Sequence, residues 1–258
     1  MSGAGAQARE GGRRVVAVTG GTQGIGLAIA ERFHREGDAV AVCSRSPRPP
    51  SLPEGILHRR ADVRRREELQ WFLDAVRDAH GSLNVWVNCA GVSGWRPIED
   101  VDEPFVEDIL HTSLLGTLWG CSVAAAAFSN GGCIVNVSSL AGKRGSPNNS
   151  VYCAAKFAVN GMTQALAKEL GPRGIRVNAV CPGYVETEGV LKVLAGPHSP
   201  ATGQGIQTYL ASFASTQTAL RRLSTAEEIA AAVWFLASPE ASAITGQCLN
   251  VDCGTLPQ

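Results

Sequence analysis

A glycine-rich turn between an apolar run and a helical pattern constrains the fold of this chain more than any other feature. Residues 14–19 (RVVAVT) form a short apolar run typical of a buried parallel strand, and residues 27–33 (LAIAERF) are apolar at helical spacing. Between them, residues 20–26 (GGTQGIG) include four glycines. Glycine lets the backbone approach a diphosphate closely, and the free amides of a helix N-terminus favour its negative charge. The turn therefore predicts a dinucleotide site, with a tight strand-to-helix turn as the plainer alternative.

The same alternation of strand and helix patterns continues along the chain. Further strands are predicted at 39–43, 56–61, 83–87, 133–137, 175–180 and 244–251, and helices at 64–79, 101–128, 152–170 and 227–237. The long helix at 101–128 is expected to kink near Gly116 or Gly120, and four prolines at 46–55 exclude a helix there. The pattern predicts an α/β fold with a single Rossmann-type, doubly wound parallel sheet of about seven strands and helices on both faces.

We expect one dinucleotide-binding catalytic domain over residues 13–258, because a chain of 258 residues with 45% hydrophobic content can bury a sizeable core. Residues 1–12 are small and polar, which predicts a disordered tail. Residues 186–219 are rich in Gly, Ser, Thr, Ala and Pro, so we expect a substrate lid there.

Charge and cysteine content exclude several classes of protein. The 23 basic residues balance 23 acidic residues, which argues against nucleic acid or an anionic membrane as the main partner. We find no signal peptide and expect no segment long enough to span a membrane, which together indicate a cytoplasmic protein. The eight cysteines lack CxxC or Cys/His metal spacing, so they are expected to be reduced core residues, and no metal site is predicted.

A tyrosine and a lysine four residues apart are the candidate catalytic pair. Tyr152 and Lys156 fall on one face of a predicted helix, so their polar ends can meet. A cation beside a phenol lowers its pKa toward the working range, which makes Tyr152 a candidate proton donor. Ser138 and Ser139 end the strand at 133–137, the edge at which open parallel sheets bind ligands. The simpler alternative is that the spacing of Tyr152 and Lys156 arises by chance, as it does on many helices.

The end of the second predicted strand bears on cofactor choice. In a dinucleotide fold, an acidic side chain at this position binds the ribose 2′-hydroxyl and repels a 2′-phosphate. This chain has Ser44 and Arg45 there. The pair favours NADP(H), although an arginine in a surface loop is more often simply solvated and NAD(H) stays possible.

With these motifs in order, the chain resembles the short-chain dehydrogenase/reductase family over nearly its whole length. The family's cofactor loop is similar to TGGTQGIG at 19–26, its NNAG motif to NCAG at 88–91, and its serine-to-tyrosine spacing to Ser139 and Tyr152. Within the family, the C-terminal patterns AEEIAAAVWFLAS and ITGQCLNVDCG are most like those of 3-oxoacyl-thioester reductases.

The resemblance implies roles for individual residues. Ser139 would hydrogen-bond a substrate carbonyl oxygen, Tyr152 would protonate it, and Lys156 would hold the nicotinamide ribose. Asp62 would bind the adenine amino group. The full set of cofactor-binding residues implied by the resemblance is Gly20, Thr22, Gln23, Gly24, Ile25, Gly26, Ser44, Arg45, Asp62, Val63, Asn88, Ala90, Gly91, Tyr152, Lys156, Pro182, Gly183, Val185 and Thr187.

Three features depart from the family pattern. Ser113 stands where many members have an asparagine that holds a water against the lysine, so we expect a rearranged or slower proton relay. The proline-rich loop at 46–55 replaces a common helix and leaves the adenosine side more open. Gln23 is neutral where NADP-binding members often carry a basic residue, which keeps an NAD-linked enzyme in consideration.

Together these features predict an NADPH-dependent carbonyl reductase with a small carbonyl or alcohol substrate, assembled as a homo-oligomer (tetramer or dimer) as family members often are. The alternatives are an NAD-dependent alcohol or polyol dehydrogenase and a non-catalytic NADP-sensing protein. Trp95 and Tyr209 could stack on the substrate or fill the core. Lys143 and Arg144 could meet an anionic group or stay solvated.

Overall fold

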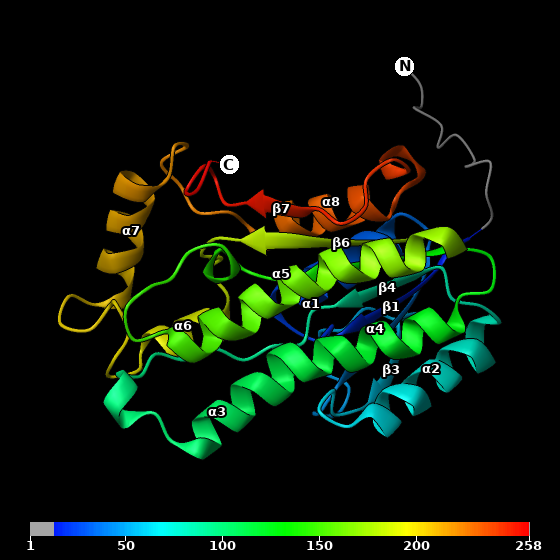
Figure 1. Ribbon diagram of the computed structural model, residues 1–258, viewed down its shortest axis with the longest axis horizontal. Coiled ribbons are helices and arrows are strands. Elements are labelled where there is room, and N and C mark those ends of the chain that lie inside the picture. The colour runs from blue at the N-terminus through cyan, green and yellow to red at the C-terminus, as the bar shows by residue number, and fades with distance from the viewer. Residues whose placement is uncertain (1–12, 258) are drawn as a thin grey trace.

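The computed structural model describes residues 13–257, which form a seven-stranded sheet with helices on both faces (Figure 1). Every neighbouring pair of strands runs parallel. The strand order is β3-β2-β1-β4-β5-β6-β7, so it changes direction between β1 and β4, the switch point at which open α/β sheets bind ligands. The strands are β1 (Val15–Thr19), β2 (Ala39–Ser44), β3 (Leu57–Arg60), β4 (Val85–Asn88), β5 (Gly132–Val137), β6 (Ile175–Pro182) and β7 (Cys248–Val251).

Helices cover the sheet in two layers (Figure 1). One face is covered by α2 (Arg66–His80), α4 (Gly116–Ala127) and α5 (Ser150–Leu170), and the other by α1 (Gly24–Arg35) and α8 (Ala226–Ala237). The remaining helices are α3 (Glu103–Ile109), α6 (Glu188–Leu194) and α7 (Ile206–Gln217), with short turns η1 (Ile98–Asp100), η2 (Leu110–Leu115), η3 (Leu140–Gly142), η4 (Gly171–Arg173) and η5 (Pro239–Ala241).

Successive side chains of each strand point to opposite faces of the sheet, so the central strands contribute to both core layers. Ala17 of β1 belongs to the cluster that contains Trp86 and the apolar faces of α2 and α4, whereas its neighbours Val16 and Val18 belong to the cluster under α1 and α8. Because the central strands are buried on both faces, they appear in the sequence as nearly continuous apolar runs. This is why the sequence pattern located them.

The predicted fold class is confirmed, and most predicted elements lie within a few residues of the observed ones. β7 is shorter than the strand predicted at 244–251, because the chain turns at Gly246, whose φ of 74° suits glycine. Residues 46–55 contain no helix, as their prolines predict. The predicted tail at 1–12 lies outside the described residues.

The helix predicted at 101–128 is interrupted by a π turn. α3 ends at Ile109, the π turn η2 follows, and α4 begins at Gly116. The π turn ends at Leu115, next to Gly116, which is one of the two positions at which a kink is predicted. Such turns place an extra residue in one turn of helix and often occur at functional sites. Here the turn carries Ser113.

One helical stretch among the described residues, Glu103–Ala127, is long and apolar enough to cross a membrane by length and composition. The expectation that no segment reaches this length was therefore wrong. Half of its most apolar window is buried inside the protein (50%), and α4 packs on α2 and β4. A core helix passes the same test, so the stretch is weak evidence for a membrane span.

The predicted lid at 186–219 is not a loose loop. It contains α6 and α7, and a small cluster of Leu194, Ala201 and Leu210 packs them together. α7 stands beyond the arrowheads of β6 and β7, at the carboxyl end of the sheet (Figure 1). The sequence pattern missed these helices because α7 buries only Leu210 and shows little apolar periodicity.

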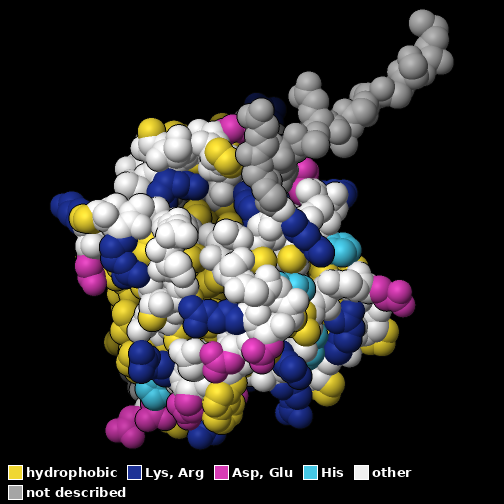
Figure 2. Space-filling view, turned by 90° about the vertical axis from the view of Figure 1, so that its right-hand side faces the viewer, with side chains coloured by type: hydrophobic (Ala, Val, Ile, Leu, Met, Phe, Trp, Pro, Cys, Tyr) yellow, Lys and Arg dark blue, Asp and Glu magenta, His cyan; other side chains and the backbone are white. Residues whose placement is uncertain are grey.

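The end of the molecule that lies opposite α7 carries both positive and negative side chains. Figure 2 shows Lys and Arg side chains interspersed with Asp and Glu side chains on this face, without a broad area of one sign. The view agrees with the balanced composition and gives no sign of a polyanion-binding surface on that face.

Candidate functional site

Three side chains from the ends of β5 and α5 meet at the carboxyl end of the sheet. Ser139 follows β5 and caps η3, where its Oγ accepts a hydrogen bond from Ala141 N at 3.1 Å. Tyr152 lies in the first turn of α5 and makes a side-chain hydrogen bond with Ser139. Lys156, one turn later, places Nζ 5.6 Å from the centroid of the Tyr152 ring. The structure thus brings the three predicted catalytic residues together.

Lys156 is fixed by burial and by the backbone of β5. Its side chain is only 4% exposed, and Nζ donates a hydrogen bond to Val137 O at 2.9 Å. Burial disfavours the ammonium and lowers the pKa of Lys156 to about 8. A Cβ at Gly91 would lie 3.8 Å from Nζ, so glycine at this position keeps the space next to the ammonium open.

The pKa of Tyr152 shifts in the direction opposite to the one predicted. Removal from water raises the pKa to about 12, and the hydrogen bond with Ser139 only partly opposes this effect. Lys156 is not among the groups that shift this pKa; its Nζ lies over the ring and donates to Val137 O. The phenol therefore keeps its proton at neutral pH, and a proton donor is what the arrangement offers.

The side chain of Ser113 is bonded to the backbone of Val92. Its Oγ donates to Val92 O at 2.8 Å and accepts from Val92 N at 3.0 Å. Both bonds tie the π turn to the segment after β4, and the rearranged or slower proton relay stays a prediction. A Cβ at Gly91 would lie 3.4 Å from Ser113 Oγ, so the tie also positions Gly91.

The turn between β1 and α1 fits a diphosphate. Gln23 is the N-cap of α1 and makes no side-chain cap bond, so the amides of the first turn have no side-chain partner. A side chain at Gly26 would collide with the carbonyl of Gly20, and Gly20 itself has a φ of 68°. Gly24, with Thr187 beside it, lies at the exposed end of the turn. Thr22 and Ile25 complete the predicted loop.

Thr19 is a residue that the sequence reasoning did not single out. Its Oγ1 accepts hydrogen bonds from Cys89 N at 3.1 Å and Ala90 N at 3.2 Å. These bonds hold the segment after β4 against the glycine turn, where Ala90 Cα would lie 2.8 Å from a Cβ at Gly20. The sequence feature that could have identified Thr19 is its position, since it places a hydroxyl at the end of a strand directly before the glycine turn.

The side chain of Asn88 points into the core. Its Nδ2 donates to Asn136 Oδ1 at 2.9 Å, and its Oδ1 accepts from Trp86 Nε1 at 2.8 Å. Only the backbone of Asn88 is available to a ligand. The segment from Asn88 to Gly91 can therefore offer a ligand its backbone groups at this edge of the sheet.

The expected adenosine side lies at the ends of β2 and β3. Ser44 ends β2, and Arg45 beside it is exposed. Burial would raise the pKa of Asp62, but hydrogen bonds from Arg64 outweigh this and lower it. Arg64 Nε and Nη2 contact Asp62 Oδ2 at 2.9 and 2.5 Å, so the predicted adenine ligand is already paired. The side chain of Val63 is buried, which leaves only its backbone for a cofactor.

The end of β6 lies at the same carboxyl edge of the sheet as the catalytic residues. Pro182 ends the strand, and a Cβ at Gly183 would lie 3.4 Å from Asp252 Cβ. Val185 is 2% exposed and packs in the core, so its side chain does not face a ligand. Thr187 caps α6 by accepting a hydrogen bond from Val190 N at 3.3 Å.

An aromatic cluster near the lid includes Tyr184, which the sequence reasoning did not select. Tyr184 Oη lies 3.1 Å from Tyr209 Oη, and the Tyr184 and Phe213 rings meet edge to face at 4.8 Å. Trp95 and Tyr209 are partly buried against the small cluster between α6 and α7. Lys143 points elsewhere, since its Nζ donates to Cys248 O at 2.6 Å. The aromatic residues therefore pack with the lid helices.

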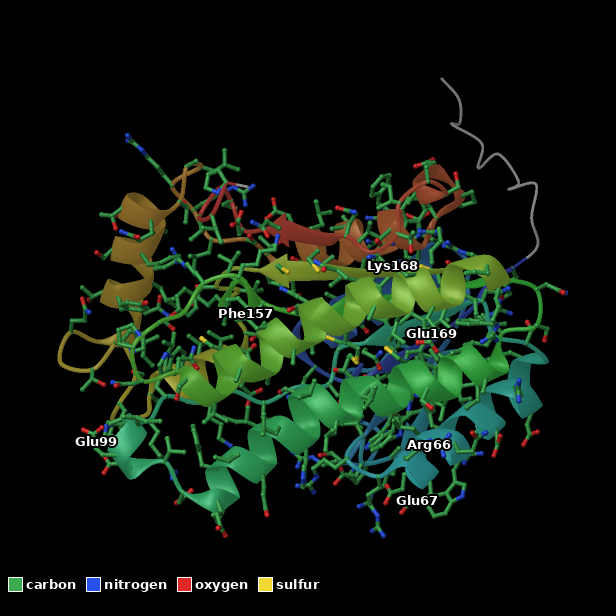
Figure 3. All side chains as sticks on the ribbon, in the orientation of Figure 1. Arg66, Glu67, Glu99, Phe157, Lys168 and Glu169 are labelled. Atoms are coloured by element: carbon green, nitrogen blue, oxygen red, sulfur yellow. The ribbon has the colours of Figure 1, made fainter. Side chains whose placement is uncertain are left out.

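A groove of about 790 Å³ lies on the outer face of α5 and does not contain Ser139 or Tyr152. Phe157 and Lys168 project from α5 on this side (Figure 3).

All eight cysteines are free thiols, and five of them are buried. Among residues 13–257 no group of His, Cys, Asp and Glu side chains is arranged to hold a metal ion.

Comparisons with known proteins cover nearly the whole chain. The family model described as enoyl-(acyl carrier protein) reductase matches residues 20–255. The chain is 36% identical to the diacetyl reductase [(S)-acetoin forming] of Staphylococcus aureus, over 93% of this chain and 97% of that protein. It is 34% identical to 2-(S)-hydroxypropyl-CoM dehydrogenase 3 of Xanthobacter autotrophicus, over 93% and 95%.

A solved structure agrees with these relatives. A single-residue variant of actinorhodin polyketide ketoreductase with NADPH superposes with a TM-score of 0.86 at 33% identity, covering 94% of this chain and 97% of that one.

Proposed function

The chain belongs to the short-chain dehydrogenase/reductase family of nicotinamide-dependent oxidoreductases that act on CH–OH and C=O groups, and from this premise we propose that it is an NADPH-dependent carbonyl reductase. The observation that carries the proposal is the hydrogen-bonded pair of Ser139 and Tyr152 with Lys156 on the next turn of α5. These groups lie at the end of the sheet where the glycine turn fits a diphosphate.

The proposed roles follow from what each group can do where it lies. A bound nicotinamide would supply the hydride for the carbonyl carbon. Negative charge then develops on the carbonyl oxygen, and Ser139 is placed to stabilise it with a hydrogen bond. Tyr152 donates its proton to that oxygen. Lys156, on the next turn of α5, would hold the ribose hydroxyls of the nicotinamide through its ammonium.

The protonation of Tyr152 supports reduction as the working direction. With a pKa raised to about 12, the phenol is protonated at neutral pH and ready to donate. Alcohol oxidation would instead need the phenolate as a base. A carbonyl reductase therefore uses the form of Tyr152 that the site favours.

The end of β2 supports NADPH as the cofactor. Ser44 and Arg45 occupy the position at which an acidic residue would select NADH. Arg45 is exposed, and its guanidinium makes no hydrogen bond among the described residues, so it is free to pair with a 2′-phosphate.

The small carbonyl substrates named for the relatives suggest where to begin. We propose an assay of diacetyl and of 3-oxoacyl thioesters, followed by cyclic ketones and keto sugars, as NADPH oxidation. The lid helices α6 and α7 with Tyr184 and Tyr209 would form the wall of the substrate pocket.

We also propose that the enzyme is a homo-oligomer joined through α5. Ala154, Ala158, Gly161 and Ala165 on this helix are small, and Phe157 beside them is 48% exposed. A second copy could approach closely over such a face, and light scattering of wild type and Phe157→Glu would test it.

Tyr152→Phe tests the proposed mechanism. The variant keeps the ring but has no proton to donate, so we expect kcat to fall at least about 100-fold. NADPH binding, measured by fluorescence titration, should change less than about twofold, because the ring and Lys156 stay in place. Turnover comparable to wild type would contradict the assignment.

A further inference from the structure

A histidine on β3 is hydrogen-bonded to the hydroxyl at the end of β2. In the register of these strands, Arg60 is paired with Ser44 and His58 with Val42, so His58 and Ser44 share one face of the sheet. His58 Nε2 lies 3.1 Å from Ser44 Oγ. Ser44 Oγ also lies 3.1 Å from Ser46 O. Two partners thus compete for a hydroxyl that carries a single proton.

Because the Ser44 hydroxyl carries a single proton, the direction in which its O–H points depends on the protonation state of the His58 imidazole. A carbonyl oxygen can only accept, so the bond to Ser46 O uses the Ser44 proton. Both bonds then exist together only if Nε2 of His58 carries a hydrogen and donates it to Ser44. A His58 protonated on both nitrogens guarantees this arrangement and leaves the hydroxyl proton of Ser44 directed away from the ring.

The charges around His58 are mainly positive. Arg48 comes from the proline-rich loop, where it donates to Ile56 O at 2.7 Å and Pro53 O at 2.8 Å. Arg60 follows on the same strand and donates from Nε to Arg45 O at 3.1 Å. Burial first, and then Arg48 and Arg60, lower the pKa of His58.

The other titratable groups near the proline-rich loop do not offset the positive charge around His58. His34 of α1 faces the loop, since its Cε1 would lie 3.2 Å from a Cβ at Gly55. Glu54 of the loop is exposed, and Asp62 after β3 is paired with Arg64. No carboxylate is among the groups that shift the pKa of His58. An anion bound at Ser44 would therefore supply the missing negative charge.

We propose that His58 is a positioning residue for the 2′-phosphate of NADPH, which it recognises through Ser44 in a proton-coupled way. The inference rests on the proposed NADPH preference and goes beyond it, because it names a residue outside the glycine turn and outside Ser44 and Arg45. A doubly protonated His58 donates to Ser44, so the Ser44 proton never points at the ring and can turn from Ser46 O to a phosphate oxygen, while the imidazolium adds a positive charge to the site.

The sign of the coupling is fixed by linkage. A bound phosphate favours the imidazolium and raises the pKa of His58, so binding takes up a proton. Affinity for the 2′-phosphate is then highest at low pH and falls as pH rises through the pKa of His58 in the complex. Ligands without that phosphate do not show this dependence.

The experiment uses ligands that lack nicotinamide, so it is independent of catalysis. Binding of adenosine 2′,5′-bisphosphate and of adenosine 5′-monophosphate is measured by calorimetry between about pH 5.5 and about pH 8.5, in wild type and His58→Gln. The phosphate itself also titrates, and the variant retains that contribution while losing the one from His58. Glutamine keeps a neutral amide that can still contact Ser44.

In wild type, we expect the affinity ratio of the two ligands to fall about tenfold more across this pH range than in His58→Gln. Calorimetry in buffers of different ionisation enthalpy should also show more proton uptake by wild type with the bisphosphate than the ligand alone explains. The second measurement needs no variant and stands if His58→Gln fails to fold.

Equal pH dependence in the two proteins, or no extra proton uptake by wild type, would overturn the role of His58 while leaving the NADPH preference intact. If wild type instead binds the bisphosphate no more tightly than the monophosphate at any pH, the proposed cofactor preference itself is wrong. The two failures are therefore distinct.

Discussion

The two ends of the expected cofactor cleft are built in opposite ways. At the nicotinamide end, Lys156 is buried and bonded to Val137 O, and Tyr152 is bonded to Ser139. At the adenosine end, Arg45 is exposed and its neighbour Ser44 lies among arginines. One end is fixed by packing and hydrogen bonds, whereas the other is a solvent-accessible cluster of positive charge.

Each end of the site should control a different property of the enzyme. Buried contacts hold atoms in one geometry and are little screened by salt, which suits the chemical step. Exposed charges are screened and adapt to the ligand, which suits the choice between two similar cofactors. Substitutions at the first end should therefore change kcat, and substitutions at the second should change the ratio of NADPH to NADH activity.

The largest effect is expected for Ser139→Ala. Loss of the hydroxyl removes the bond to Tyr152 and the proposed donor to the carbonyl oxygen, so kcat should fall about 100- to 1,000-fold. Ser138→Ala is the matched control, because Ser138 is buried and its Oγ contacts Lys156 O at 3.4 Å. Steady-state kinetics at saturating NADPH would compare them, and equal losses in the two variants would contradict the role of Ser139.

Arg45→Asp should exchange the cofactor preference with a smaller effect on rate. The new carboxylate repels a 2′-phosphate and can accept a bond from a ribose hydroxyl. We expect the kcat/KM ratio of NADPH to NADH to fall about 10- to 100-fold. Arg66→Asp, with the same change of charge at the start of α2 (Figure 3), should leave the ratio unchanged. A wild type that prefers NADH would show the proposal for Ser44 and Arg45 to be wrong.

The pH dependence of carbonyl reduction tests the nicotinamide end of the site, because Lys156 titrates there. Lys156 has a pKa lowered to about 8, so its ammonium is present below that pH and is lost as pH rises through it. Carbonyl reduction at saturating NADPH should therefore slow about tenfold by about pH 9. Lys156→Arg, which stays charged, should have lower activity but a flat profile over the same range. A flat wild-type profile would contradict the role of the ammonium.

The sequence could predict the fold and the catalytic trio because both depend on local spacing. Tyr152 and Lys156 are one helical turn apart wherever the helix lies, and the glycine turn is defined by the strand and helix on either side. Apolar runs located the buried strands for the same reason.

The sequence could not predict features that depend on distant partners. The bonds of Ser113 to Val92 cross 21 residues of sequence, and the pKa of Tyr152 reflects desolvation by the folded chain. His58 meets Ser44 only because β2 and β3 pair in one register. The helices α6 and α7 likewise form with little periodicity, since packing at the end of the sheet stabilises them.

The smallest expected effect, that of salt, compares the two ends within the wild-type protein. Raising the ionic strength from about 0.05 M to about 0.5 M shortens the screening length to a few ångströms and weakens the attraction between exposed Arg45 and a 2′-phosphate. The Kd of NADPH should therefore rise about threefold more than that of NADH, while kcat changes little because Lys156 is buried and Tyr152 is only partly exposed. Fluorescence titration and initial rates at both salt concentrations measure the two quantities. A large change in kcat with an unchanged Kd ratio would mean that the charges at the catalytic end, and not those at β2, are the ones that solvent ions reach.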